Sequence, residues 1–162
     1  MHVTTILTTL AVLIPVFAIP TGNPDDTTRQ ILARQALAAP PPCVRSTPPP
    51  TADELKARFD KFVIAFVGPA GKKNITEAFE YIAADYINHN PAAKNGAGSA
   101  WGILSPIWQG MSHTYIRSSI KGDMSWVNYG TSQFGEIVDR FRWEGGCIAE
   151  HWDVGESYPA SK

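Results

Sequence analysis

Residues 136–159, EIVDRFRWEGGCIAEHWDVGESYP, read as two antiparallel strands joined by a tight turn. Polar and apolar side chains alternate over residues 136–143 and again over residues 147–154, which is the period-two pattern of half-buried strands. The intervening Glu144-Gly145-Gly146 is typical of a hairpin turn, because glycine tolerates the positive φ angles that tight loops often need. The pattern therefore predicts a β-hairpin near the C-terminal end of the chain.

The same alternation sorts the side chains of this hairpin onto two faces. The residues predicted to share one face are Asp139, Phe141 and Trp143 of the first strand and Ala149, His151 and Asp153 of the second. Ile148 is predicted on the opposite face. Two carboxylates and an imidazole can thus line one side of the hairpin beside aromatic rings. An ordinary solvated polar face fits the pattern equally well.

Length and composition indicate one globular domain with a hydrophobic core and additional tails. The chain has 162 residues, of which 44% are hydrophobic and 18% are charged. The formal net charge is −1, which provides no general attraction to nucleic acid or to an anionic membrane. Neither is therefore expected as a partner.

Residues 1–18 have the character of a secretory signal peptide. A mostly apolar run begins at Val3 and ends at the small residue Ala18, as signal-peptidase sites do. The alternative is an ordinary buried helix. We predict cleavage near Ala18 and an extracellular mature protein that has no membrane-spanning segment.

Secretion changes how the two cysteines and one asparagine are interpreted. Cys43 and Cys147 are expected to form a disulfide rather than to remain free thiols, because secreted proteins fold in an oxidising environment. This bond would connect the N-terminal arm to the start of the last strand. Asn74-Ile75-Thr76 matches the N-glycosylation sequon, and Asn74 is the predicted acceptor.

The chain divides into four parts. After the signal peptide, residues 19–50 are polar and rich in proline, which predicts an extended, flexible arm. Residues 51–159 carry the periodic apolar patterns of a folded domain, and residues 160–162 form a tail.

Three helices are predicted in the first half of the domain. Thr51 and Glu54 fit a capping box at the start of the first helix, and Gly68-Pro69 ends it. A second helix, capped by Asn74 or Thr76, is predicted to end before Pro91. A third helical pattern covers residues 99–110, where Pro106 limits or kinks the helix.

About four antiparallel strands are predicted to follow. Residues 111–120 and 124–131 alternate and precede the C-terminal hairpin. Helices followed by strands indicate an α+β fold rather than the βαβ order of a parallel sheet.

The sequence contains no recognised motif for a metal or a phosphate group. Its four histidines are scattered, and a glycine-rich phosphate loop and a nucleophile elbow are both missing. We expect neither a metal nor a cofactor. The alternative is a cation bound by the histidine and aspartate of the last strand. His89 lies just before Pro91. It is either a histidine favoured at a helix C-terminus by the helix dipole or a hydrogen-bonding group at the rim of a pocket.

Two segments carry a resemblance to a known family. YINHNP at residues 86–91, followed by Asn95-Gly96, resembles the "YIxHNP…G" segment of SnoaL-like proteins. VDRFR at residues 138–142 and GCIAEHWDV at residues 146–154 resemble their "vDxFR…GkIxEHWDV" ending. The chain is thus similar over about residues 51–159 to the nuclear transport factor 2-like superfamily, which includes polyketide cyclases and ketosteroid isomerase.

The resemblance implies a cone-shaped, curved antiparallel sheet packed with three N-terminal helices and enclosing a blind pocket. In the polyketide cyclases of this family an aspartate on a strand acts as acid and base in an aldol closure, without metal or cofactor. Carried over by position, Asp153 is the first candidate for this role and Asp139 the second. His151 and His89 match motif positions and are the further catalytic candidates.

The resemblance and the apolar pattern together predict which residues line the pocket. These residues are Asn90, Trp101, Trp108, Trp126, Asn128 and Phe141. Asn128 stands where many relatives are expected to have a histidine. The signal peptide, the arm and the cysteine pair are also not part of the family pattern.

Three functions remain open from the sequence. The chain is a secreted cyclase or isomerase that acts on a small, apolar carbonyl compound. Alternatively it is a non-catalytic domain that binds a small hydrophobic ligand or a partner protein, or it is a structural module that forms a homodimer. A carboxylate buried enough to have a raised pKa would favour the enzyme, whereas Asp139 and Asp153 both pointing into bulk water would favour the binding domain.

Overall fold

The computed structural model describes residues 37–69 and 71–160. The predicted signal peptide, residues 19–36 of the predicted arm and residues 161–162 lie outside this part. The fold is α+β, as predicted, although one strand lies between the second and third helices instead of after them. The helices are α2 (Ala52–Val67), α3 (Ile75–Phe79), α4 (Ala97–Leu104) and the short 3₁₀ helix η1 (Trp108–Gly110). The strands are β1 (Ile82–Asn88), β2 (His113–Lys121), β3 (Met124–Thr131), β4 (Gly135–Glu144) and β5 (Cys147–Trp152).

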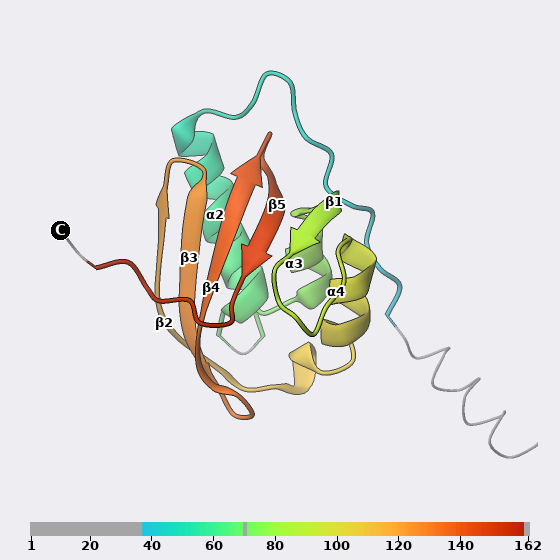
Figure 1. Cartoon of the computed structure of the whole chain (residues 1–162), viewed down its shortest axis with the longest axis vertical. Coiled ribbons are helices and arrows are strands. Elements are labelled where there is room, and N and C mark those ends of the chain that lie inside the picture. Colours follow the sequence, from blue (N-terminus) through green and yellow to red (C-terminus); the bar gives the residue numbers. More distant parts are fainter. Residues whose placement is uncertain (1–36, 70, 161–162) are drawn as a thin grey trace, which may run out of the picture. The chain divides into compact units, whose positions relative to one another are not determined.

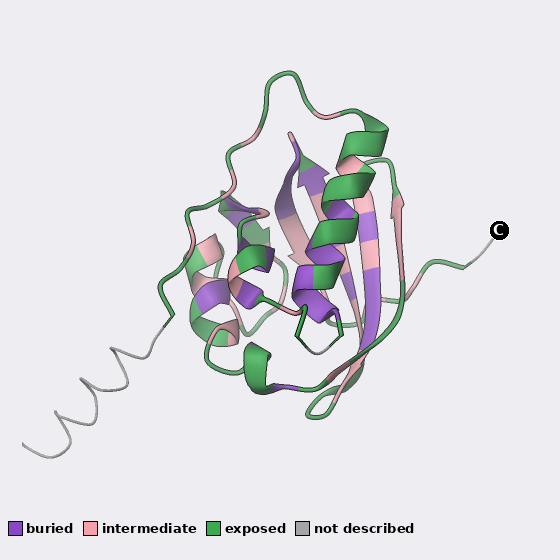
Figure 2. Ribbon diagram, turned by 180° about the vertical axis from the view of Figure 1, so that it is seen from behind, coloured by how far each residue is buried: buried purple, intermediate pink, exposed green. Residues whose placement is uncertain are grey.

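The five strands form one mixed sheet in the order β1-β5-β4-β3-β2. Strands β2 to β5 pair antiparallel with their neighbours, whereas β1 pairs parallel with β5. The prediction of a wholly antiparallel sheet was therefore wrong at this edge. Helix α2 packs across one face of the twisted sheet, and the buried residues lie between these two layers (Figures 1 and 2).

The N-terminal helix α2 forms for the predicted reasons. Thr51 accepts a hydrogen bond from the Glu54 amide, and the Glu54 carboxylate accepts one from the Thr51 amide, which completes the capping box. The inner face of α2 carries Phe59, Phe62 and Phe66, all buried. The rings of Phe62 and Phe66 meet Phe141 edge to face on β4, and this contact joins the helix to the sheet.

The second predicted helix was only partly right. Asn74 does cap a helix, because its side chain accepts hydrogen bonds from the amides of Thr76 and Glu77. The helix ends at Phe79, however, and the rest of the predicted segment is strand β1. A short apolar run fits the period of a helix as well as that of a strand, and backbone pairing with β5 makes this segment a strand. The third predicted helix is divided into α4 and η1 around Pro106, which has no amide hydrogen to donate.

The C-terminal hairpin has the predicted turn, with one shift in register. His151 pairs with Phe141, so these two side chains share the core face. A bulge between Arg142 and Trp143 then places Ile148 opposite Trp143. Ile148 is therefore fully buried on the core face, which contradicts its predicted place on the outer face.

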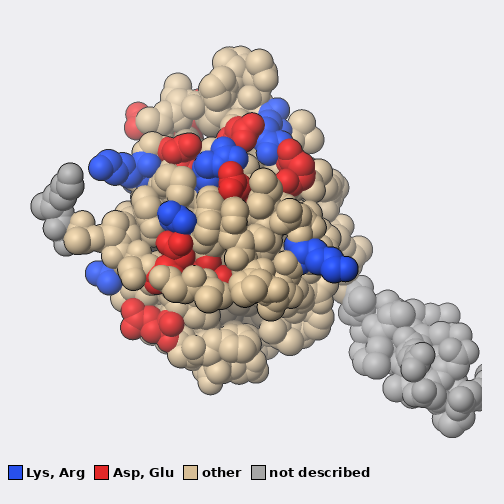
Figure 3. Space-filling model, in the orientation of Figure 1, with Lys and Arg blue, Asp and Glu red and all other residues tan. Residues whose placement is uncertain are grey.

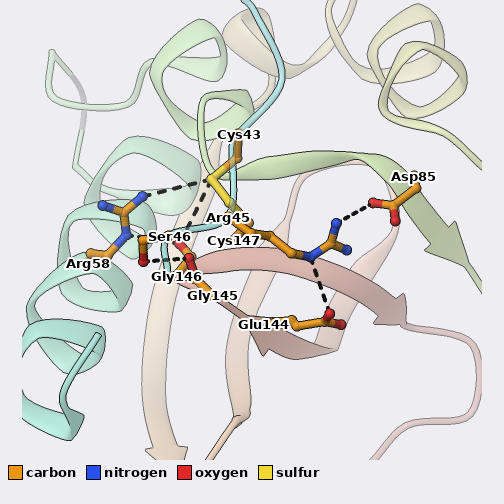
Figure 4. The surroundings of a disulfide bond; sticks show 9 residues. All are labelled: Cys43, Arg45, Ser46, Arg58, Asp85, Glu144, Gly145, Gly146 and Cys147. Carbon is orange, nitrogen blue, oxygen red and sulfur yellow. Dashed lines mark hydrogen bonds and ion pairs between the residues drawn. A yellow bond between two sulfur atoms is a disulfide. The ribbon is translucent and has the colours of Figure 1, made fainter. Parts of the chain in front are cut away.

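Residues 37–50 run extended and are fixed to the domain at several points. Cys43 and Cys147 form the expected disulfide, with their Cα atoms 5.7 Å apart (Figure 4). The Cys43 amide donates to the Ile82 carbonyl (2.9 Å), and the Ser46 amide donates to the Gly145 carbonyl (2.8 Å). Arg45 pairs with Asp85 at 2.8 Å. This part of the predicted arm thus covers the outer edge of β1 at its start.

None of the helices in the described part of the chain has the length and apolar character needed to span a bilayer.

The disulfide is expected to be a major source of stability. It joins residues 104 positions apart, and the loop-entropy model assigns about 4–5 kcal/mol to closing a loop of that size. The double variant Cys43→Ala/Cys147→Ala should therefore unfold at a clearly lower urea concentration than the wild type. The reduced wild type should show the same shift, which separates loss of the crosslink from loss of packing at Cys147. Equal midpoints for all three forms would contradict this role.

Candidate functional site

A cavity of about 920 Å³ lies against the core face of the sheet. Side chains of α2, α3, α4, η1 and all five strands line it, together with the segment that follows β5. Nine of the lining residues are Phe, Tyr or Trp. The rings that line it deep in the fold are Phe62, Phe66, Phe79, Tyr86, Trp108, Tyr129 and Phe141. This volume and composition are typical of a site for a small apolar molecule.

A chain of hydrogen bonds crosses this apolar lining. The Tyr129 hydroxyl donates to Asp139 Oδ2 (2.8 Å), and His151 Nε2 lies 3.0 Å from Asp139 Oδ1. His151 Nδ1 lies 3.3 Å from Asn88 Oδ1. Asp139 is only 2% exposed, so its charge is balanced inside the protein by these partners.

Asp153 extends this cluster towards the opening of the cavity. Asp153 Oδ2 accepts from Asn90 Nδ2 (2.6 Å), and Oδ1 accepts from the Val154 amide (2.7 Å). Both donors are neutral groups. The Asp153 carboxylate therefore lies in the cavity lining, half-buried, without an ion-pair partner among the described residues.

The histidine between the two carboxylates is favoured in its charged form. Burial by itself lowers the pKa of His151, but the charge and hydrogen bond of Asp139 outweigh it. The charge of Asp153 acts in the same direction. The net result is a raised pKa for His151, whose Nε2 faces Asp139.

Tyr86 contributes a hydroxyl that no described residue satisfies. The side chain is only 3% exposed and lines the cavity, and its ring stacks on His151 at 6.4 Å. Burial, with the nearby charges of Asp139 and Asp153, raises the pKa of Tyr86 far above its usual range. The hydroxyl thus stays protonated and is available to donate a hydrogen bond to a bound molecule.

The structure brings together most of the residues predicted for the site. Asp139, His151, Asp153 and Asn90 form the polar cluster. Trp108 and Phe141 lie in the lining, as predicted for pocket residues.

Four predicted residues lie elsewhere, for reasons of strand phase and packing. His89 is exposed and stacks on Trp152 at 4.3 Å, with Nε2 2.8 Å from Glu150 on the outer face. Trp126 pairs with Arg140, and this position also points to the outer face. Neither lines the cavity.

Trp101 and Asn128 are buried but serve the scaffold rather than the cavity. The Trp101 ring packs edge to face on Phe79 at 5.0 Å, and its Nε1 donates to the Leu37 carbonyl. Asn128 accepts from Arg117 Nε (3.1 Å) and donates to the Ile137 carbonyl (3.0 Å).

The sequence analysis did not identify Tyr86, Tyr129 or Asn88 as site residues. Tyr86 and Asn88 were assigned to a helix, in which residues two positions apart do not face the same side. On a strand, residues two positions apart share a face, so that reading 82–88 as a strand would have placed both beside the histidine.

The polar cluster also contains the groups that could hold a metal ion. Asp139, His151 and Asp153 each offer one ligand atom, and these atoms lie within 4.8 Å of one another. A carboxylate–imidazole set of this kind suits several divalent ions. The expectation of a metal-free site remains a prediction.

No protein-family model and no curated protein sequence matches this chain. Among solved structures it is similar to TsrD from Streptomyces laurentii (16% identity, 64% of this chain and 89% of that chain, TM-score 0.47). It is also similar to a nuclear transport factor 2-like protein from Cytophaga hutchinsonii (12% identity, 61% of this chain and 87% of that chain, TM-score 0.48). A candidate polyketide cyclase from Sinorhizobium meliloti matches as well (14% identity, 64% of this chain and 98% of that chain, TM-score 0.46). At these values the similarities do not indicate what this chain binds or does.

The raised pKa of His151 predicts how stability depends on pH. Because the folded-state pKa lies above the ordinary value of 6.5, this group stabilises the fold fully below pH 6.5. The contribution is lost as the pH rises through the folded-state pKa. Urea unfolding between about pH 5.5 and pH 9 should show this alkaline loss in the wild type but not in His151→Gln. An NMR titration that places the His151 pKa at or below 6.5 would refute the assignment.

Proposed function

We propose that the protein binds an apolar carbonyl compound in this cavity and catalyses proton transfer beside the carbonyl, as a cyclase or an isomerase does. The observation that carries the proposal is the cluster of Asp139, His151, Asp153 and Tyr86 within an aromatic cavity. A carboxylate and a phenol can serve as base and hydrogen-bond donor without a covalent intermediate.

Asp153 is the proposed base. Its two oxygens accept hydrogen bonds only from neutral groups, so no ion pair engages it, and it lies in the cavity lining. Asp139, in contrast, is bound to Tyr129 and His151 through both of its oxygens. We therefore assign to Asp139 a positioning role, in which it holds the His151 imidazolium in place.

The proposed step moves one proton and one electron pair. Asp153 takes a proton from the carbon next to the carbonyl, and the electrons of that C–H bond form an enolate. The Tyr86 hydroxyl donates a hydrogen bond to the enolate oxygen, and the His151 charge stabilises it. Return of the proton to a different carbon completes an isomerisation. Attack of the enolate on a second carbonyl within the same molecule, followed by protonation of the new alkoxide, completes a cyclisation.

A second candidate function uses the same cavity without chemistry. Every carboxylate oxygen of Asp139 and Asp153 already accepts a hydrogen bond within the protein. A fully satisfied polar network is also what a rigid binding site requires. In this case the protein is a carrier or sensor of an apolar ligand.

Exchange of ketone protons for deuterium separates the two functions without a known substrate. In D₂O, the wild type should accelerate exchange beside the carbonyl of apolar ketones such as 2-tetralone, as followed by ¹H NMR. Asp153→Asn should lose about 10²–10⁴-fold of this acceleration with the fold intact, because that is the usual contribution of a positioned base. Asp139→Asn should lose less of this acceleration than Asp153→Asn. Tyr86→Phe should slow exchange while the ketone still binds.

Asp60→Asn is the matched control, since this exposed carboxylate on α2 pairs only with Lys56 and lies outside the cavity. It should leave exchange unchanged. EDTA should also leave it unchanged, and loss of activity on chelation would replace the metal-free mechanism with a metal site at Asp139, His151 and Asp153. Full activity in both Asp153→Asn and Asp139→Asn would leave only the binding function.

We also propose that the mature protein is extracellular. The disulfide supports this location, because such bonds are rarely kept in the reducing cytosol. Asn74 is exposed, and only its carbonyl oxygen is used, in capping α3. The amide nitrogen is therefore free to carry a glycan.

Expression of the whole chain in a eukaryotic host tests the proposed location and the modification together. The protein should appear in the medium without residues 1–18 and should lose mass on treatment with an N-glycosidase. Asn74→Asp keeps a helix-capping oxygen but cannot accept the glycan, and it should be secreted without the mass change. Retention in the cell with residues 1–18 still attached would contradict secretion.

A further inference from the structure

Two stretches without charged side chains meet at one end of the fold. Residues 95–116 and residues 124–135 contain no Lys, Arg, Asp or Glu. The first includes α4 and η1, and the second ends in the turn between β3 and β4. The Ser132 amide donates to the Ser112 carbonyl and so joins the two stretches directly (3.3 Å). In Figure 1 η1 and the turn between β3 and β4 lie at the lower end of the domain.

The cavity reaches the surface at this uncharged end. Four of its lining residues are large apolar side chains that remain exposed: Ile103 (44%), Ile107 (37%), Phe134 (60%) and Val154 (68%). We call these four residues the apolar mouth. Asp139 and Tyr86 of the polar cluster lie deeper, since they are only 2% and 3% exposed, while Asp153 is half-buried. The cavity thus runs from a buried polar end to an exposed apolar end.

Charged side chains do not cover the whole face of the molecule. Figure 3 shows them over its upper-middle and middle parts and at its lower left, whereas the lowest part of the face is tan. Some charged groups do line the cavity. Glu156 pairs with Arg140 (2.9 Å), and Arg117 lies over the Tyr158 ring (4.2 Å). Glu136 accepts a hydrogen bond from Asn128 (2.9 Å). The four side chains of the apolar mouth themselves offer no charged partner to a ligand.

From this gradient we infer that the ligand is an elongated carbonyl compound whose aliphatic chain extends through the apolar mouth. The inference rests on the proposed function, because it takes the polar cluster as the site of the carbonyl. The carbonyl oxygen lies near the Tyr86 hydroxyl, and the chain passes the aromatic rings. Its far end covers Ile103, Ile107 and Phe134, which removes apolar surface from water on both partners.

A homologous series of methyl ketones tests this arrangement. We would titrate 2-octanone, 2-dodecanone and 2-hexadecanone, each delivered from the same cyclodextrin solution, and follow protein fluorescence, since Trp108 lines the cavity. Affinity should continue to rise along the whole series, in the direction expected for burial of each added methylene.

Variants of the apolar mouth test whether the aliphatic chain of the ligand lies there. Ile103→Ser/Phe134→Ser should weaken binding of 2-hexadecanone about tenfold or more and change binding of 2-octanone less than about twofold, in line with the worth of buried methylenes. Val44→Ser/Ile64→Ser is the matched control, because these apolar residues are also exposed (88% and 48%) but lie outside the cavity. It should bind every ketone like the wild type. Near-ultraviolet circular dichroism confirms that each variant is folded.

The possible outcomes separate this inference from the proposed function. Binding of all ketones with the same affinity, or equal loss for short and long chains in the mouth variant, overturns the elongated ligand but leaves the proton chemistry standing. Binding with the expected chain dependence but without deuterium exchange supports the inference and refutes catalysis. Absence of binding at every length refutes both. Sedimentation with phosphatidylcholine vesicles, or dimerisation that depends on Phe134, would assign the mouth to a membrane or to a second copy and overturn the inference.

Discussion

The backbone pairing between β1 and β5 is the interaction on which the candidate site depends. The Ile148 amide donates to the Tyr81 carbonyl and the His89 amide to the His151 carbonyl, at the two ends of this pair. Parallel pairing places β1 beside the strand that carries His151, although the two are separated by about sixty residues of sequence. Asn88, Tyr86 and Asn90 then reach His151 and Asp153. Without the pairing, the hairpin would hold two aspartates and a histidine but would lack Asn90, which donates to Asp153, and Asn88, which contacts His151.

The site combines groups whose charges are balanced to different degrees. Asp139 and His151 form a buried pair in which each charge stabilises the other, while Tyr129 occupies the remaining oxygen. Asp153 has only neutral donors, and Tyr86 has no partner among the described residues. The protein thus contains both a fixed polar unit and two groups that can still interact with a ligand. This division, rather than the presence of carboxylates alone, is what favours chemistry over a purely structural network.

Local patterns in the sequence predicted the hairpin and the gathering of Asp139, His151 and Asp153, because alternation and a glycine turn are properties of adjacent residues. Strand β1 could not be recognised in the same way. Its apolar residues fit a helix as well as a strand, and only the partner strand decides between them. Ile148 was misplaced because a bulge inserts one residue without a clear local signal. Trp126 was assigned to the pocket for its aromatic ring, whereas its phase relative to Val127, which pairs with Asp139, places it on the other face.

The crosslinked arm also determines where the folding unit begins. Thr51 is the first residue of the capping box, but the contacts of Cys43, Arg45 and Ser46 belong to the same unit. A strand at the edge of a sheet can recruit strands of other molecules, and proteins avoid this by covering the edge. Here the arm occupies the start of β1, where Cys43 forms a bridge with Ala83. A fragment trimmed to Thr51 would leave this edge open and Cys147 as an unpaired thiol, and both are routes to intermolecular association.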